Sequence, residues 1–268
     1  MIDDLKQAPT TTRIRQLPRN VWAVGLTSFF MDISSEMVMY ILPLFLANAL
    51  GIHTAIIGLI EGLAEATASI LKLFSGWLSD RLGGRKWLAV FGYGLSAVAK
   101  PFFYFANTWG LVAGVRWADR VGKGIRTAPR DALVADSVTK EIRGLAFGFH
   151  RALDTAGAMV GILIAALVVW LAQKNSLELS RYTFQIIVLV SMVPAFLAVL
   201  SLAIGAKDVP VQGQRTAPRL SLRGMGKPFI IFLVIVSIFT LGNSSDAFLV
   251  LRAQNLGMSV TGILIMLV

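Results

Sequence analysis

Arg116, Asp119 and Arg120 are three charged residues that interrupt an apolar stretch beginning near Trp109. In a helix that starts there and rises about 1.5 Å per residue, Arg116 lies about 10 Å and Arg120 about 16 Å from the start. An ionised side chain near the middle of a bilayer costs at least about 2.5–3.5 kcal/mol, so it must face protein or a water-filled cavity. We therefore expect these three residues to line a buried polar cavity. The charged residues of 123–131 are expected to form mostly a solvated helix end.

A second group of candidates is acidic. Asp32, Glu36 and Tyr40 follow one another at intervals of four residues in a long apolar stretch, so they share one helix face. Carboxylates removed from water have raised pKa values and can bind and release protons near neutral pH. Asp32 and Glu36 are our first candidates for proton binding, with a structural role as the alternative. Tyr40 can supply a hydrogen bond or can simply pack.

Glu61 and Glu65 repeat the four-residue spacing in the next apolar stretch. We expect them to pair with Lys72 or Lys100 and to hold helices together, with proton binding as the alternative. Lys100 also lies deep enough in its own apolar stretch to meet an anionic substrate.

Other ionisable residues complete the candidate cavity. Asp154 reaches a depth in its stretch similar to that of Arg120, and we predict an ion pair between the two. Arg151 lies beside it in sequence, and Asp246 lies within a later apolar stretch.

The composition indicates an integral membrane protein. Of 268 residues, 56% are hydrophobic and only 15% are charged, and the mean hydropathy is +0.70. Stretches such as 155–172 and 184–206 contain no charge and are long enough to cross a hydrocarbon layer of about 30 Å. The net charge of +10 does not indicate nucleic-acid binding, because the basic residues lie in short connections between apolar stretches. We predict helices at 20–47, 52–77, 86–106, 108–127, 145–172, 183–206 and 228–252, with an eighth from 258 cut off at 268.

The basic residues also predict the orientation. They concentrate in residues 1–19, in the second and fourth connections and in 207–227, which places these segments on the cytoplasmic side. The predicted domains are a cytoplasmic tail (1–19), a six-helix bundle (20–206), a cytoplasmic linker (207–227) and the start of a second bundle (228–268). The sequence of residues 33–36 is weakly similar to that of residues 243–246, which favours a transporter built from two duplicated halves.

One loop resembles a family signature. The stretch Gly76-Trp77-Leu78-Ser79-Asp80-Arg81-Leu82-Gly83-Gly84-Arg85-Lys86 is similar to the loop between the second and third helices of the major facilitator superfamily. In that family the loop latches the two halves of the transporter, with its Asp at a helix end in the second half. The resemblance implies that role for Gly76, Leu78, Asp80, Arg81, Gly83, Arg85 and Lys86. Two departures stand out: Gly84 replaces a basic residue, and Ile162 replaces the Pro of the family's antiporter signature at Gly157 and Gly161.

An enzyme is the first alternative. The chain has two distant histidines, no cysteine and no phosphate-binding loop, so neither a metal site nor a cofactor is predicted.

We therefore predict an all-α secondary transporter that moves small solutes by alternating access. We expect it to be proton-coupled and monomeric, and to lie in a plasma membrane of the bacterial inner-membrane type. A facilitated-diffusion uniporter is one alternative. The other is a truncated fragment that does not transport, because family members have about twelve spans. The substrate, its charge and the direction of transport are left open by the sequence.

Overall fold

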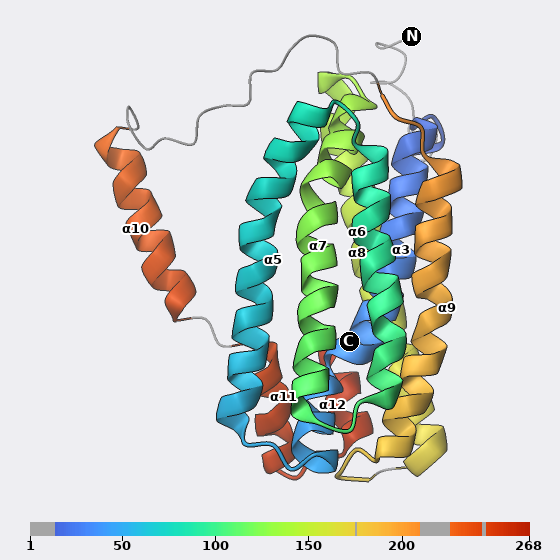
Figure 1. The fold of residues 1–268 in the computed structure, drawn as a ribbon, viewed down its shortest axis with the longest axis vertical. Coiled ribbons are helices and arrows are strands. Elements are labelled where there is room, and N and C mark those ends of the chain that lie inside the picture. Colours follow the sequence, from blue (N-terminus) through green and yellow to red (C-terminus); the bar gives the residue numbers. More distant parts are fainter. Residues whose placement is uncertain (1–13, 175, 210–225, 243–244) are drawn as a thin grey trace.

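The computed structural model describes residues 14–174, 176–209, 226–242 and 245–268, and these residues form helices joined by short connections (Figure 1). Most of the predicted tail and of the predicted linker lies outside this part of the chain. Among the described residues, six long helices form the bundle: α3 (Arg19–Met39), α5 (Thr54–Leu82), α6 (Lys86–Ala99), α7 (Trp109–Asp136), α8 (Arg143–Gln173) and α9 (Arg181–Gly205).

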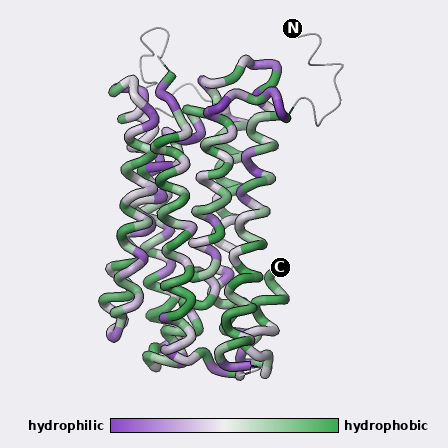
Figure 2. Tube along the Cα trace, turned by 90° about the vertical axis from the view of Figure 1, so that its right-hand side faces the viewer, coloured by the Kyte–Doolittle hydropathy of each residue, from purple (hydrophilic) through white to green (hydrophobic). Residues whose placement is uncertain are grey.

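Five of the helical spans are long and apolar enough to cross a membrane. The long helix α7 does not meet that criterion, because it carries the charges of the stretch from Arg116 to Asp131. The prediction of an all-α integral membrane protein is confirmed. Figure 2 shows the apolar character along most of the bundle, and large side chains such as Leu73, Phe91 and Leu171 are exposed on its outer surface. Such a surface suits hydrocarbon rather than water.

Some predicted helices end elsewhere in the structure. The first span continues from α3 through a short turn, α4 (Leu42–Leu44), into a π-helical segment, η1 (Phe45–Ala49). The third changes at Lys100 into a 3₁₀ segment, η2 (Lys100–Phe105), where Pro101 lacks a backbone donor. The fourth was predicted to end at residue 127 but continues to Asp136, and a 3₁₀ turn, η3 (Lys140–Ile142), leads into α8.

Two helix pairings organise the bundle: α3 packs against α8 and α9, while α7 packs against α5 and α6. The α3–α8 contact depends on Gly157 and Gly161, one turn apart on α8. A Cβ at Gly161 would lie 2.5 Å from the carbonyl oxygen of Ile33, and one at Gly157 would collide with the carbonyl of Phe29. Small residues at this spacing let two membrane helices approach closely.

Two apolar cores fill the bundle, one toward each end. We call the end that holds Arg19, the 83–85 turn and Gly205 the linker end, and the opposite end the far end (Figure 1). Val24, Tyr93 and Leu133 belong to the core at the linker end. At the far end, the rings of Phe45 and Phe184 stack with centroids 3.9 Å apart.

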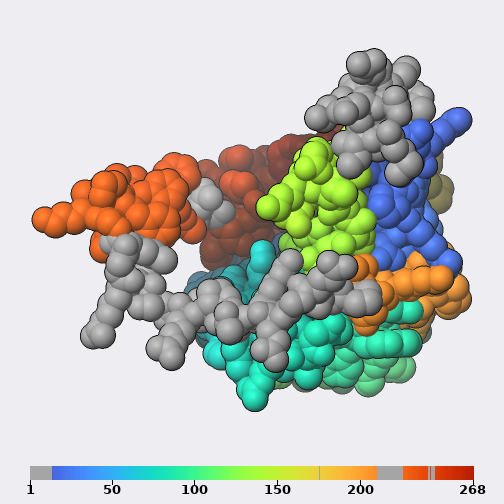
Figure 3. Space-filling view, turned by 90° about the horizontal axis from the view of Figure 1, so that it is seen from above, coloured from blue at the N-terminus to red at the C-terminus, as the bar shows by residue number. Residues whose placement is uncertain are grey.

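The predicted seventh helix, 228–252, is not one helix. The structure has α10 (Lys227–Leu241) and α11 (Asp246–Asn255), followed by α12 (Val260–Leu267). Ser245 begins α11 by accepting a hydrogen bond from the amide of Ala247 at 3.4 Å. The helix α10 projects to one side of the bundle (Figure 3), whereas α11 packs on α4 and α5, and α12 packs on α8.

Candidate functional site

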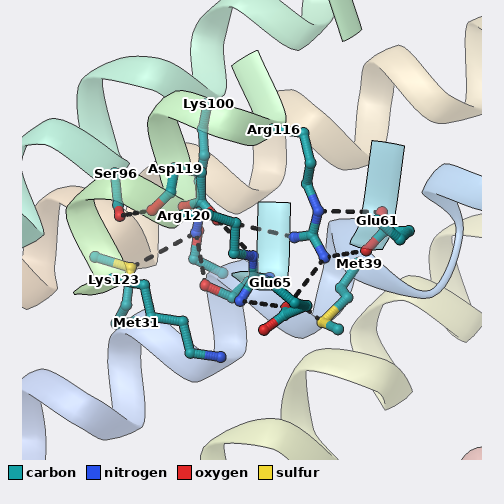
Figure 4. Close-up of polar contacts among 12 residues, drawn as sticks. Met31, Met39, Glu61, Glu65, Ser96, Lys100, Arg116, Asp119, Arg120 and Lys123 are labelled. Atoms are coloured by element: carbon teal, nitrogen blue, oxygen red, sulfur yellow. Dashed lines mark hydrogen bonds and ion pairs between the residues drawn. The ribbon is translucent and has the colours of Figure 1, made fainter. Parts of the chain in front are cut away.

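The central feature of the bundle is a network of charges between α5 and α7, all buried except Glu65, whose side chain is 48% exposed (Figure 4). Arg116 Nε donates to Glu61 Oε1 at 3.1 Å, and its Nη2 lies 2.5 Å from Glu61 Oε2, so the pair is bidentate. Arg120 Nη1 lies 3.2 Å from Glu65 Oε1, and Asp119 Oδ2 lies 3.7 Å from Arg120 Nε. Glu61 and Glu65 are four residues apart on α5, as Arg116 and Arg120 are on α7, so each pair occupies two successive turns of its helix. The two helices run in the same direction, so each acid faces one arginine.

These partners differ from those expected from the sequence. Arg120 was expected to pair with Asp154, but Glu65 takes that position. Glu61 and Glu65 were expected to pair with lysines, but both contact arginines of α7. Sequence depth alone could not decide this, because it gives height in the membrane and not which helices are neighbours.

Small residues allow α5, α6 and α7 to come together around this network. A Cβ on Gly122 would lie 2.6 Å from the carbonyl oxygen of Gly92, and one on Gly124 would lie 2.9 Å from the carbonyl oxygen of Ala68. Ser75 Oγ donates to the Gly124 carbonyl at 2.8 Å, which adds a polar contact between α5 and α7.

Lys100 is buried, with 2% of its surface exposed, at the point where α6 changes into η2. Its Nζ donates to Ser34 Oγ at 2.5 Å and to Ser35 Oγ at 3.1 Å, and it lies 3.6 Å from Met31 Sδ (Figure 4). Among the described residues it has no carboxylate within ion-pair distance. Lys100 therefore connects α6 to the face of α3 that carries the candidate acids.

Asp32, Glu36 and Tyr40 line that face of α3, and all three are half-buried. Within the described part of the chain they make no hydrogen bond or ion pair. The charges of Asp154 on α8 and Arg126 on α7 both act on Asp32. These three residues are therefore among the polar groups of the described interior whose hydrogen-bonding capacity is free.

The charged residues of 123–131, near the end of α7, were predicted to be mostly solvated, and two of them are not. Arg126 and Arg130 are buried. Arg126 Nη1 donates to Ser96 Oγ at 2.5 Å, and its guanidinium lies 4.6 Å from the centre of the Tyr93 ring, within cation–π range. The prediction was wrong because α7 continues past Pro129, so both arginines stay inside the bundle.

Two other candidates lie outside the central network. Arg151 is exposed (65% of its side chain) and pairs with Asp154 on the same helix at 3.2 Å. Asp246 was expected at mid-span but stands exposed in the first turn of α11, where an acid suits the positive helix end.

The candidate latch forms a compact site at the linker end. Gly83 ends α5 in the left-handed conformation, with φ of +67°, which directs the chain into α6. The buried Arg85 lies 3.2 Å from Asp80 and 2.8 Å from Asp136, and a cavity of about 350 Å³ adjoins them. Asp208 Oδ1 accepts from the amides of residues 85 and 86, at 2.9 and 3.0 Å. Gly76 and Leu78 lie on α5, while the side chains of Arg81 and Lys86 rest on neighbouring tryptophan rings.

Asp136 and Asp208 were missed by the sequence analysis. Each is more than fifty residues from the loop that it holds, and no spacing in the sequence connects them to it.

The fold and these sites define an all-α membrane protein with charged groups concealed inside a helix bundle. The chain belongs to the family described as the Major Facilitator Superfamily, whose model matches residues 24–268. The resemblance drawn from the loop at Gly76–Lys86 is confirmed.

Relatives and solved structures agree with that family. An uncharacterized MFS-type transporter of Methanocaldococcus jannaschii is 37% identical over 246 residues, which is 92% of this chain and 59% of the relative. A multidrug resistance protein, MdtH, of Aeromonas hydrophila is 29% identical over 58% of this chain and 38% of its own length. A crystal structure of a POT family transporter in complex with 5-aminolevulinic acid has a TM-score of 0.64 at 15% identity, covering 84% of this chain and 46% of its own. That likeness shows the fold alone. The chain spans between about two fifths and three fifths of the length of these curated relatives.

Proposed function

We propose that this chain forms part of a secondary transporter that moves small solutes across a membrane by alternating access, coupled to protons. The observation that supports this most directly is the acidic face of α3 inside the bundle. Asp32 and Glu36 have no bonded partner among the described residues, whereas Glu61 and Glu65 pair with arginines of α7. Ionised groups inside a membrane are expensive, so an unpaired acid there marks a pathway for an ion or a substrate.

The paired and unpaired charges suggest a division of roles. The pairs of α5 with α7, Arg116 with Glu61 and Arg120 with Glu65, hold two helices together. Asp32 and Glu36 are the proposed proton-binding residues, with Tyr40, Lys100 and the network of Arg116, Asp119 and Arg120 beside them in the cavity. Arg151 with Asp154, and Asp246, are assigned to the margins of the same cavity.

The two ends of the bundle support alternating access. At the far end, Gln254 of α11 donates to Asn48 Oδ1 at 2.8 Å, and the amide of Val260 donates to the Ser176 carbonyl at 3.0 Å. These bonds join the segments after the linker to the six-helix bundle and close that end. At the linker end, we propose that Asp80, Arg81, Arg85 and Lys86 act as the latch that the family loop implies.

The proposed setting is a plasma membrane of the bacterial inner-membrane type, with the linker end cytoplasmic and the transporter monomeric. The positive residues at the linker end, Arg19, Arg81, Lys86 and Lys207 among them, support that orientation. The similar proteins suggest compounds to try first: drugs, after the multidrug resistance protein, and 5-aminolevulinic acid, after the solved POT transporter.

The test is proton release on addition of substrate to the purified protein in weakly buffered detergent solution. Asp32→Asn and Glu36→Gln are compared with Glu178→Gln, a matched change of an exposed acid near the far end. Release that one of the two α3 variants abolishes and the control retains supports coupling and names the carboxylate. Binding of a compound without release in the unmodified protein would refute coupling and favour a uniporter.

A further inference from the structure

A second buried polar cluster lies between the acidic face of α3 and the linker end. His150 of α8 has 1% of its surface exposed, and its Nε2 lies 2.8 Å from Ser28 Oγ on α3. The same Nε2 lies 3.6 Å from Asp154 Oδ1, one turn along α8. Ser28 Oγ also lies 3.4 Å from the Tyr93 hydroxyl and accepts from Arg130 Nη1 at 3.3 Å.

Two atoms of this cluster have free capacity. Among the described residues, His150 Nδ1 and Asp154 Oδ1 are buried without a hydrogen-bond partner. An unsatisfied buried polar atom costs about 1–3 kcal/mol, so two such atoms in one small cluster suggest a functional role that offsets this cost. Proton transfer is such a role, because each of these atoms gains a partner when a proton or a water molecule arrives.

The hydroxyl of Ser28 suits either protonation state of the ring. It can donate its hydrogen to Nε2 of a neutral imidazole that carries its proton on Nδ1. It can equally accept from Nε2 once that nitrogen is protonated, while Arg130 still donates to the second lone pair. His150 can therefore take up a proton at Nε2 without moving its neighbours.

The cluster is aligned with the proposed proton-binding acids. Ser28, Asp32 and Glu36 occupy successive turns of α3, so each lies about 6 Å from the next along the helix axis. On the facing helix, His150 and Asp154 occupy successive turns, and the charge of Asp154 acts on Asp32. The charged groups that face His150 come from two helices: Arg130 and Asp131 of α7, and Arg151 and Asp154 of α8.

We propose that His150 is a proton-transfer residue between Asp32 and the linker end, an inference that rests on the proposed proton coupling. The proton leaves the Asp32 carboxyl, is accepted by the Asp154 carboxylate, and passes to Nε2 of neutral His150. Each step breaks one bond to hydrogen and forms one; the two acids are left as carboxylates, and the ring is left as neutral imidazole. The imidazolium releases the proton from Nδ1 to water that enters when the linker end opens. Asp131, 29% exposed, is a partly solvated acid whose charge acts on His150.

The test uses this chain with ¹⁵N-labelled histidine. Because it has two histidines, His53→Gln leaves His150 as the single reporter. We expect the ring ¹⁵N shifts to titrate in two steps, since coupled sites release protons in two macroscopic stages. Asp154→Asn should reduce this to one step, and Asp154→Glu should restore two. Asp32→Asn should keep two steps but shift them, and the exposed control Glu178→Gln should change nothing. An unchanged curve in Asp32→Asn, or a ring in one state at every pH, would overturn the relay.

A kinetic measurement separates the relay from the proposed coupling. In the proton-release assay, His150→Gln should slow release at least tenfold and leave the Kd of the same compound unchanged. Release as fast as in the unmodified protein overturns the relay and leaves the coupling intact. Absence of release in the unmodified protein, with a compound that binds, overturns both.

Discussion

Removal of Glu61 should destabilise the bundle more than removal of any exposed charge. Glu61→Gln leaves the buried Arg116 guanidinium without its bidentate partner, and breaking a buried pair from one side costs about 3–5 kcal/mol. Arg116 still has Glu65 Oε1 at 3.7 Å and Asp119 Oδ2 at 3.9 Å. These longer contacts replace part of the lost interaction, so we expect a loss near the lower limit, about 3 kcal/mol.

The assay is thermal unfolding in detergent followed by tryptophan fluorescence. A loss of about 3 kcal/mol corresponds to a fall in Tm of about 6–12 °C for a chain of this size. Arg151→Gln is the matched control, because its ion pair is exposed, and exposed pairs are worth about 0–1 kcal/mol.

A double variant tests the cause. Glu61→Met with Arg116→Met removes both charges and keeps their volume, so it should be more stable than Glu61→Gln alone. The reasoning is refuted if Glu61→Gln changes Tm no more than Arg151→Gln does. It is refuted equally if the double variant loses the sum of the two single losses.

Three further predictions follow from close contacts. Gly161→Ala should lower the free energy of unfolding by about 1–3 kcal/mol, because the added Cβ would meet a carbonyl of α3. Gly114→Ala is the control and should not lower it, because a Cβ there meets nothing within 4 Å. Thermal unfolding measures both. Asp208→Ala removes the acceptor of two amides at the start of α6, so hydrogen exchange there should accelerate about fivefold to thirtyfold; unchanged exchange would mean that the linker does not hold the loop. Gln254→Ala removes the hydrogen bond to Asn48. Because the chain has no cysteine, a single cysteine can be placed in the adjacent far-end loop, and the variant should increase its labelling by maleimide. Equal labelling would show that this hydrogen bond does not close the far end.

Some of the site followed directly from the sequence. The charges of α7 from Arg116 to Arg120 were expected to be buried, and they are, because a charge within an apolar stretch has no other low-energy place. The latch loop was recognised from its own residues, since a turn that reverses between two spans depends on local chemistry such as the glycine at position 83.

Other parts could not be derived in that way. The break between α10 and α11 was missed because hydropathy measures only how apolar a stretch is and does not mark where one helix ends and the next begins. The burial of Arg126 and Arg130 was missed because Tyr93 and Ser96, which receive Arg126, lie on another helix.

The sequence by itself determined the class of protein, the approximate spans and the depth of charges such as Arg116 and Arg120, because all three depend on composition and on a fixed rise per residue. Only the tertiary structure decided which charge meets which. Partners such as Arg120 with Glu65, or Arg85 with Asp136 and Asp80, depend on which helices are neighbours and how closely they approach. Glycines set how closely the helices approach, because a glycine leaves room for the backbone of a neighbouring helix. Gly161, which packs against the backbone of Ile33, is an example.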